Sequence, residues 1–380
     1  MNLDSVRVLD LTRLLPGPYA TQLLADLGAD VLKVEDPDRG DYARYLPPIT
    51  DDGTGAVFEA VNRGKRSVAL DLKADDGRDA FLELVEDADV LIESFRPGVV
   101  DRLGIDHETV RERNPDLVYC SLSGYGQEGP YRDHAGHDLG YVGLAGLLDV
   151  TRTDRDERPR IPGYPIADMA GGLSAAFVIV SALLSRELGG TGGTYLDCSL
   201  SDAVLSFSQA VATPALYGDD PRPGDDFLTG GHPWYNVYET ADGRYVTLSA
   251  LEPKFWRVFC DAVDRPDLAS VHGTDDEAEQ AALRAELEDV FADRTRDEWV
   301  AFVDPDVPVA PVLTPAEALE HPQFADRGLV RRGDDPAILS PIRGASPAPS
   351  ETPGHGEHTR DVLASIGYDE AAIESLLDGD

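Results

Sequence analysis

Val6-Arg7-Val8-Leu9-Asp10-Leu11 and Val31-Leu32-Lys33-Val34-Glu35 are the two apolar runs that decide the fold of this chain. Between them, Pro16-Gly17-Pro18 opens a stretch that keeps apolar residues on one face as far as Leu27, and Gly28 follows it. Proline in the first turn and glycine just past the last turn are typical helix boundaries. The chain therefore begins with a strand, a helix and a second strand, the unit from which parallel sheets are built.

The same alternation of strands and helices continues to about residue 200. Further strands are predicted at 67–72, 90–93, 117–122 and 195–198, with helices between them. Consecutive parallel strands are joined by right-handed crossovers, so few topologies remain. We predict an α/β fold whose large domain is a doubly wound parallel sheet.

The pattern changes after residue 217, which indicates a second domain. Two strands flank the turn Asp242-Gly243, a strong hairpin signal, and helices are predicted at about 252–264, 277–291 and 295–303. Sheet and helix segregate here instead of alternating, so we expect a smaller α+β domain.

Polar stretches rich in proline and glycine set the expected domain boundaries. The large domain is expected to cover 1–217 and to be completed by C-terminal helices within 340–380. A linker at 218–227 leads to the small domain at 228–325, and a second linker covers 326–339.

The chain is strongly acidic, with a formal net charge of −38 and only four lysines among its 33 basic residues. Nucleic-acid binding relies on basic surfaces, so we expect no nucleic-acid partner. Such acidity is typical of proteins kept soluble in concentrated salt, where charge repulsion is screened. Because no signal peptide and no apolar run of spanning length is evident, we expect a protein of a high-salt cytoplasm without a membrane partner.

Two familiar site patterns are not supported. Cys120, Cys198 and Cys260 lie far apart and the histidines are scattered, so neither a disulfide framework nor a metal site is expected. Gly124-Tyr125-Gly126-Gln127-Glu128-Gly129 matches a dinucleotide-binding pattern, but Pro130 follows it and Glu128 would place negative charge beside a pyrophosphate. We interpret this segment as a loop.

His137 and Asp168 are the candidate acid–base residues. Each precedes a segment with apolar residues at helical spacing, so each is expected near a helix N-terminus. Such a position stabilises negative charge, and an imidazole and a carboxylate there could move protons at a carbon that becomes anionic. The alternative is that both residues only cap their helices, or that His137 belongs to the core.

Basic residues gather between positions 31 and 113, where strand ends of an open sheet bind ligands. Arg39 is one of these residues, Lys65 lies in a loop that enters a strand, and Arg96 follows the end of another strand; guanidinium groups there suit phosphates. The alternative for each arginine is an ion pair with one of the surplus carboxylates. As a group they indicate a phosphorylated ligand such as a nucleotide-bearing cofactor.

At this point the chain resembles the class III CoA-transferases over most of its length. The resemblance rests on Pro16-Gly17-Pro18, Leu24–Val31, Gly64-Lys65-Arg66-Ser67, Arg96-Pro97-Gly98, Ser123–Gln127 and Ala167-Asp168. Within that family, the segments Ala135–Asp138, Gly230–Tyr235 and Ala250–Phe255 are similar to the α-methylacyl-CoA racemase branch. The transferases usually lack a histidine at the place of His137 and use the aspartate at the place of Asp168 as a nucleophile.

The resemblance implies an isomerase that inverts the α-carbon of 2-methylacyl-CoA thioesters by two-base proton transfer through an enolate. His137 and Asp168 would be the two bases, the backbone N–H at Asp138 would hold the enolate oxygen, and Glu252 would orient His137. Tyr141 would line the acyl pocket, or be an ordinary packing residue of its helix.

The resemblance also implies how the substrate binds. Arg39, Lys65 and Arg96 would contact CoA, which enters as part of the substrate, and no permanently bound cofactor is expected. Two subunits of this family interlock as a homodimer, so that Glu252 would come from the partner chain.

One residue departs from the racemase pattern, which has asparagine where Gly140 stands. This leaves the acyl group open. Two alternatives also remain: a CoA-transferase that moves CoA between carboxylic acids with Asp168 as nucleophile, and a CoA-binding homologue without catalysis.

Overall fold

The computed structural model describes residues 2–190, 192–219, 223–333, 336–341 and 351–378. Parts of both expected linkers (220–222 and 334–335) and of the expected C-terminal segment (342–350 and 379–380) lie outside the described residues. The chain divides into two compact units. The first comprises 1–145, 163–207 and 328–380, and the second comprises 146–162 and 208–327.

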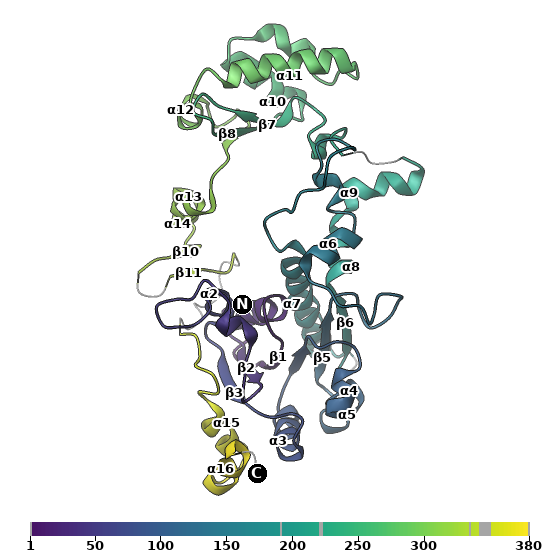
Figure 1. Cartoon of the computed structure of the whole chain (residues 1–380), viewed down its shortest axis with the longest axis vertical. Helices are drawn as coiled ribbons and strands as arrows, with labels where there is room; N and C mark the ends of the chain where they lie inside the picture. The colour runs from purple at the N-terminus through teal and green to yellow at the C-terminus, as the bar shows by residue number, and fades with distance from the viewer. Residues whose placement is uncertain (1, 191, 220–222, 334–335, 342–350, 379–380) are drawn as a thin grey trace. The chain divides into compact units, whose positions relative to one another are not determined.

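A six-stranded parallel sheet forms the centre of the first unit (Figure 1). Its strands are β1 (Arg7–Leu11), β2 (Asp30–Glu35), β3 (Arg66–Ala69), β4 (Val90–Glu93), β5 (Val118–Ser123) and β6 (Tyr195–Ser199), in the order β3-β2-β1-β4-β5-β6. The order reverses between β1 and β4, which defines the switch point of a doubly wound sheet. The predicted α/β fold is confirmed.

Helices cover both faces of this sheet. They are α1 (Pro16–Asp26), α2 (Ala56–Asn62), α3 (Asp75–Glu86), α4 (Val99–Leu103), α5 (His107–Arg113), α6 (Asp138–Leu144), α7 (Ile166–Glu187), α8 (Leu200–Phe207), α15 (Thr359–Ser365) and α16 (Glu370–Asp378). On one face α3, α5, α15 and α16 share an apolar core with the strands, while α1 and α7 pack on each other and on the strands of the other face. The unit also contains η1 (Tyr42–Tyr45) and the short pair β10 (Val330–Arg331) and β11 (Ala337–Ile338).

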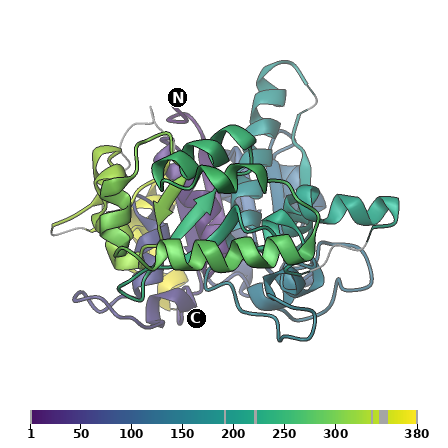
Figure 2. The ribbon, with the colours of Figure 1, turned by 90° about the horizontal axis from the view of Figure 1, so that it is seen from above.

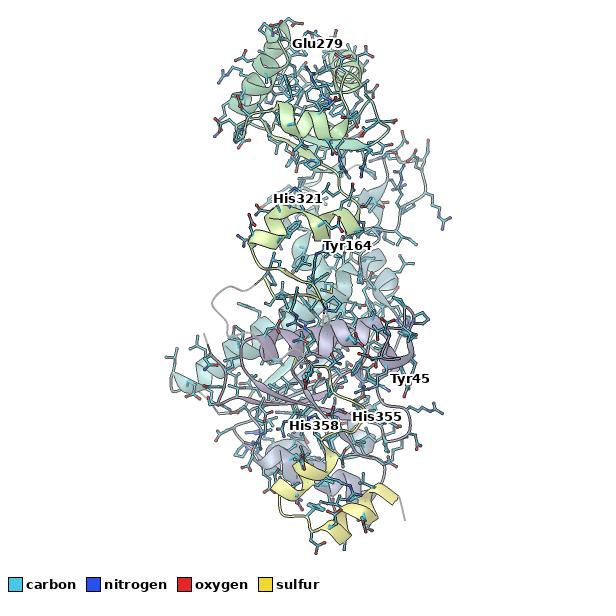
Figure 3. The ribbon with its side chains drawn as sticks, turned by 90° about the vertical axis from the view of Figure 1, so that its left-hand side faces the viewer. Tyr45, Tyr164, Glu279, His321, His355 and His358 are labelled. Atoms are coloured by element: carbon cyan, nitrogen blue, oxygen red, sulfur yellow. The ribbon has the colours of Figure 1, made fainter. Side chains whose placement is uncertain are left out.

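The C-terminal segment returns along the open edge of the sheet at β3 (Figure 3). Nδ1 of His358 accepts the Ser67 amide at 3.3 Å, and the ring of His355 is hydrogen-bonded to the carbonyl of Asp36 at 2.9 Å. These contacts cover a strand edge that would otherwise expose unpaired backbone groups.

Helix α7 is the one helix among the described residues that is long and apolar enough to cross a membrane by length and composition. One side of it is buried, including Ala167, Ala170, Gly171 and Ala175. Small residues on this side allow close packing on its neighbours, because a Cβ on Gly171 would lie 2.1 Å from the Leu200 side chain. This side belongs to the core of the first unit.

A three-stranded antiparallel sheet with helices forms the second unit (Figure 2). Its elements are β7 (Tyr235–Glu239), β8 (Tyr245–Ser249), β9 (Val309–Pro311), α9 (Gln209–Ala212), α10 (Pro253–Ala262), α11 (Glu277–Phe291), α12 (Arg296–Phe302), α13 (Pro315–Glu320), α14 (Pro322–Asp326), and the 3-10 turns η2 (Asp149–Thr151), η3 (Thr213–Tyr217), η4 (Phe227–Thr229) and η5 (Pro266–Ser270). Trp234, Trp256, Phe259, Phe291 and Trp299 fill its core. The unit is the α+β body that the Asp-Gly hairpin predicted.

Apolar residues at helical spacing follow His137 from Leu139 to Leu148, but the helix there is shorter than this pattern suggests. It ends at Leu144, because Gly146 adopts a positive φ of 83° that interrupts the helix. The chain then passes into the second unit over residues 146–162 before α7 begins.

Candidate functional site

A cavity of about 600 Å³ lies at the carboxyl end of the parallel sheet in the first unit. Its walls include residues that follow β1, β2, β3 and β4, among them Arg13, Arg39, Lys73 and Arg96. Because β1 and β4 flank the point where strand order reverses, this is the crevice in which open α/β sheets bind their ligands.

Two of the sequence-predicted cations, Arg39 and Arg96, line this one cavity. Both side chains are exposed, and among the described residues neither forms an ion pair. The cavity also has carboxylates: Glu35 pairs with Arg44 at 2.7 Å and Asp41 pairs with Lys33 at 2.9 Å, while Asp36, Asp38 and Asp71 line it as well. In a chain with 71 acidic residues, arginines left without carboxylate partners at a cavity indicate an anionic ligand.

Lys65 lies elsewhere, inside the fold. Its ammonium is fully buried and contacts the Asp10 carboxylate at 3.2 Å, the Thr21 hydroxyl at 2.7 Å and the Asn62 side-chain oxygen at 2.8 Å. Burial would raise the pKa of Asp10, but Lys65 and Lys33 beside it hold that pKa at about 2. Lys65 therefore neutralises a buried carboxylate, and we do not carry it into the proposed ligand site.

Asp138 joins the start of α6 to the start of α7. Its carboxylate accepts hydrogen bonds from the amides of Ala167 at 2.6 Å and Asp168 at 3.1 Å, so it caps α7 from another helix. His137, the residue before it, is the N-cap of α6 in extended conformation. The structure thus brings the backbones of His137 and Asp168 together through one side chain.

The Asp168 carboxyl is an acid–base group poised near neutrality. Burial raises its pKa, the negative charge of Asp138 raises it further, and together they bring it to about 6. Asp168 lies in the first turn of α7, where the helix dipole favours the ionised form. Desolvation outweighs that effect, and a pKa near the working pH is what general acid–base catalysis requires.

Tyr141 is a buried phenol on α6. Its pKa is raised to about 12 by burial, by Tyr125, and by the charge of Asp168, while Arg96 acts in the opposite direction. The side chain is 7% exposed, and its ring packs edge-on against Tyr125 with centroids 5.0 Å apart. The Tyr141 ring is therefore a packed part of the first unit.

Two glycines make room for the Tyr141 ring. A Cβ on Gly124 would lie 2.4 Å from that ring, and one on Gly136 would lie 2.6 Å from it. No helix follows the glycine-rich segment 124–129 directly, and Gly126 and Gly129 adopt positive φ. The segment is a loop against Tyr141, as interpreted from its sequence.

His137 and Glu252 are each the N-cap residue of a helix, and the two helices belong to different units. The His137 side chain is exposed at the start of α6 in the first unit. Glu252 is the N-cap of α10 in the second unit and is also exposed.

Gly140 opens space beside Tyr125. A Cβ at this position would lie 3.3 Å from the Tyr125 hydroxyl, with no other neighbour within 4 Å among the described residues. The absence of a side chain at Gly140 therefore leaves this hydroxyl uncovered from that direction.

Two contributors were missed by the sequence reasoning. Arg13 lies just past the carboxyl end of β1 and lines the cavity. The sequence signal that could have identified it is a basic residue two positions after the first strand of an acidic chain. The carboxylate of Asp138 was missed as a cap of α7, because its partners are about thirty residues away and no local pattern marks them.

Comparisons with known proteins identify the family of the chain. The model of CoA-transferase family III matches residues 3–360. The chain belongs to this family.

Some of its relatives are named as CoA-transferases and others as racemases. The chain is 36% identical to the succinyl-CoA:mesaconate CoA-transferase of Haloarcula hispanica, over 98% of this chain and 99% of the relative. It is also 36% identical to the alpha-methylacyl-CoA racemase of Mus musculus, over 99% of this chain and 96% of the relative. A solved structure of a CAIB/BAIF family protein from Brucella suis superposes with a TM-score of 0.81 at 32% identity, covering 95% of this chain and 98% of that one. This family III protein is an enzyme of acyl-CoA chemistry.

Proposed function

We propose that this family III enzyme is an α-methylacyl-CoA racemase, which inverts the α-carbon of a 2-methylacyl-CoA thioester. The observation that carries the proposal is Asp168, a partly buried carboxyl with a pKa of about 6, joined through Asp138 to His137. Racemisation needs two groups that exchange a proton with carbon near neutral pH, and this pair has the required chemistry.

The reaction proceeds in two proton transfers. One base, His137 or Asp168, removes the α-proton, and the electron pair of the broken C–H bond moves onto the thioester oxygen as an enolate. The other residue, in its protonated form, returns a proton to the opposite face, so the thioester is regenerated with inverted configuration. No oxidant or second substrate is consumed, and the two bases exchange protonation states in each turnover.

The enolate oxygen requires hydrogen-bond donors. Helix α6 begins at Asp138, so the backbone N–H of this residue lies in the first turn, where amides lack an intrahelical acceptor. We assign this N–H to the enolate, an arrangement that stabilises charge developed in the transition state. The Asp138 carboxylate is meanwhile engaged by α7.

The substrate enters through its CoA part, and we propose no permanently bound cofactor. The proposal assigns the CoA phosphates to the cavity that holds Arg39 and Arg96, two cations without ion pairs among the described residues. The proposal places the thioester beside Tyr141, whose ring packs against Tyr125 with centroids 5.0 Å apart. Glu252, contributed by the partner chain of a homodimer, is proposed to hold the His137 ring.

A homodimer is also proposed. Helix α7 exposes Leu173, Phe177, Leu184 and Leu188 at helical spacing, with Phe177 71% exposed. Four large apolar side chains on one side of a helix are a surface that association would remove from water. The proposal places a second copy of this chain there.

A CoA-transferase is the second candidate, favoured by the similarity to the succinyl-CoA:mesaconate enzyme. In that reaction the ionised Asp168 would attack the thioester carbonyl, forming a mixed anhydride and releasing CoA thiolate. The thiolate would attack the Asp168 carbonyl, which releases the donor acid and leaves an aspartyl-CoA thioester. The acceptor carboxylate would displace CoA thiolate from this thioester as a second anhydride, and attack of the thiolate on the acceptor acyl carbonyl would give the new acyl-CoA and regenerate Asp168. Such a nucleophile needs no histidine partner for proton transfer at carbon.

One assay separates the two candidates. A single enantiomer of a 2-methylacyl-CoA is incubated with the enzyme in deuterated buffer, with and without a free carboxylic acid. The racemase proposal expects deuterium at the α-carbon and loss of optical purity without the acid. CoA transfer that requires the acid, with no label at the α-carbon, would establish the transferase instead.

A further inference from the structure

Arg13 lies beside the switch point of the sheet. It follows β1, while Phe95 and Arg96 follow β4, and these two strands are neighbours with reversed connections on either side. All three residues line the cavity of about 600 Å³. Arg13 is half-buried and, among the described residues, forms no ion pair.

The backbone on both sides of Arg13 is held by a buried ion pair. The Lys33 ammonium donates to the carbonyl of Thr12 at 2.8 Å and pairs with Asp41 at 2.9 Å, and both side chains are fully buried. Asp41 in turn accepts the Leu14 amide at 3.0 Å. Leu14 has a φ of 68°, a conformation that residues other than glycine rarely adopt, and these contacts maintain it.

The side chain of Arg13 is held as well. Its guanidinium lies over the Tyr42 ring at 5.1 Å and over the Phe95 ring at 5.2 Å, measured to the ring centroids. One nitrogen donates to the Tyr42 hydroxyl at 3.3 Å. Cation–π contacts restrain a guanidinium without neutralising its charge, and they leave its other N–H groups for an anion.

We propose that Arg13 is a phosphate-binding residue of the CoA site and that Tyr42 is its positioning residue. This rests on the proposed function, since CoA supplies the phosphate. A planar guanidinium binds two phosphate oxygens at once, and one held in advance loses little freedom on binding. Arg13 thus adds a third arginine to the cavity of Arg39 and Arg96.

CoA offers two sources of phosphate, its diphosphate and its 3′-phosphate. Dephospho-CoA lacks only the 3′-phosphate, so it distinguishes them. The experiment is isothermal titration of the full chain with CoA and with dephospho-CoA at one fixed ionic strength. Arg13→Gln is compared with wild type and with Arg111→Gln, a matched change of charge on the exposed face of α5.

Arg13→Gln is expected to raise the Kd for CoA about 10- to 100-fold, the range for losing charge-assisted hydrogen bonds, while Arg111→Gln leaves it unchanged. The same loss with dephospho-CoA assigns Arg13 to the diphosphate, and a loss seen only with CoA assigns it to the 3′-phosphate. Tyr42→Leu is expected to weaken binding, and Tyr42→Phe, which keeps the ring, to restore most of it.

A Kd for both ligands within about twofold of wild type in Arg13→Gln overturns the proposal. If that variant does not fold, Arg13→Met, which removes the charge and keeps a long side chain, takes its place, and unchanged binding in it overturns the proposal equally. A wild-type chain that binds neither ligand contradicts the proposed function itself, so the two failures are distinguishable.

Discussion

The charge of Asp138 tunes the acid–base group of the proposed reaction. Replacing Asp138 by asparagine removes a negative charge beside Asp168 but keeps a side-chain oxygen that can accept the α7 amides now bonded at 2.6 and 3.1 Å. The substitution therefore changes the electrostatics while preserving the cap. We expect the pKa of Asp168 to fall.

The size of this fall follows from the causes of the shift. Burial and Asp138 together raise the pKa of Asp168 from 3.8 to about 6, and burial is the larger of the two. Asp138 therefore accounts for less than half of the rise, so Asp138→Asn is expected to lower the pKa by up to about one pH unit.

The pH profile of α-proton exchange measures this directly. For the enantiomer whose α-proton Asp168 removes, kcat/KM should rise with pH as Asp168 ionises, with a midpoint near 6 in wild type. Asp138→Asn should move that midpoint to lower pH, and Asp168→Asn should abolish the profile. Asp138→Ala serves as a control for the cap, because loss of its two hydrogen bonds should lower stability by about 0.5–2 kcal/mol. An acidic midpoint that does not move in Asp138→Asn would refute the reasoning.

Three further predictions concern stability, habitat and assembly. Lys65→Met removes one member of a fully buried ion pair and should lower the free energy of unfolding by about 3–5 kcal/mol. Lys73→Met, at a side chain that is 77% exposed, should change that free energy by less than about 0.5 kcal/mol. Urea unfolding compares the two variants, and equal effects would contradict the structural role of Lys65. Lowering salt from about 2 M to 0.05 M should lower Tm, because repulsion in a chain of net charge −38 is then screened far less; an unchanged Tm would rule out salt adaptation. Phe177→Glu should convert a dimer to monomers in light scattering, and a mass equal to that of wild type would argue against α7 as the interface.

The sheet could be predicted because its signals are local. Each buried parallel strand is a short apolar run, and Gly28, with a φ of 101°, ends α1 where its position in the sequence indicated. The length of α6 was overestimated, because apolar residues continue past Gly146 and only the backbone shows that the helix has ended.

The site was predictable only in part, because its residues meet through tertiary contacts. Arg39 and Arg96 could be assigned to strand ends, and strand ends of one sheet converge at one cavity. Nothing local shows that Lys65 turns inward to Asp10, or that Asp138 reaches the α7 amides. Both contacts depend on how a strand or helix is oriented towards elements that are distant in the sequence.

The central claim is that His137 and Asp168 are the two bases of an inversion at carbon. The most direct measurement follows each enantiomer of a 2-methylacyl-CoA in deuterated buffer, without an acceptor acid, for wild type, His137→Ala and Asp168→Asn. The account predicts deuterium incorporation with inversion in wild type and loss of inversion in both variants. Inversion at the wild-type rate in His137→Ala, or a wild-type enzyme that incorporates no deuterium, would contradict it.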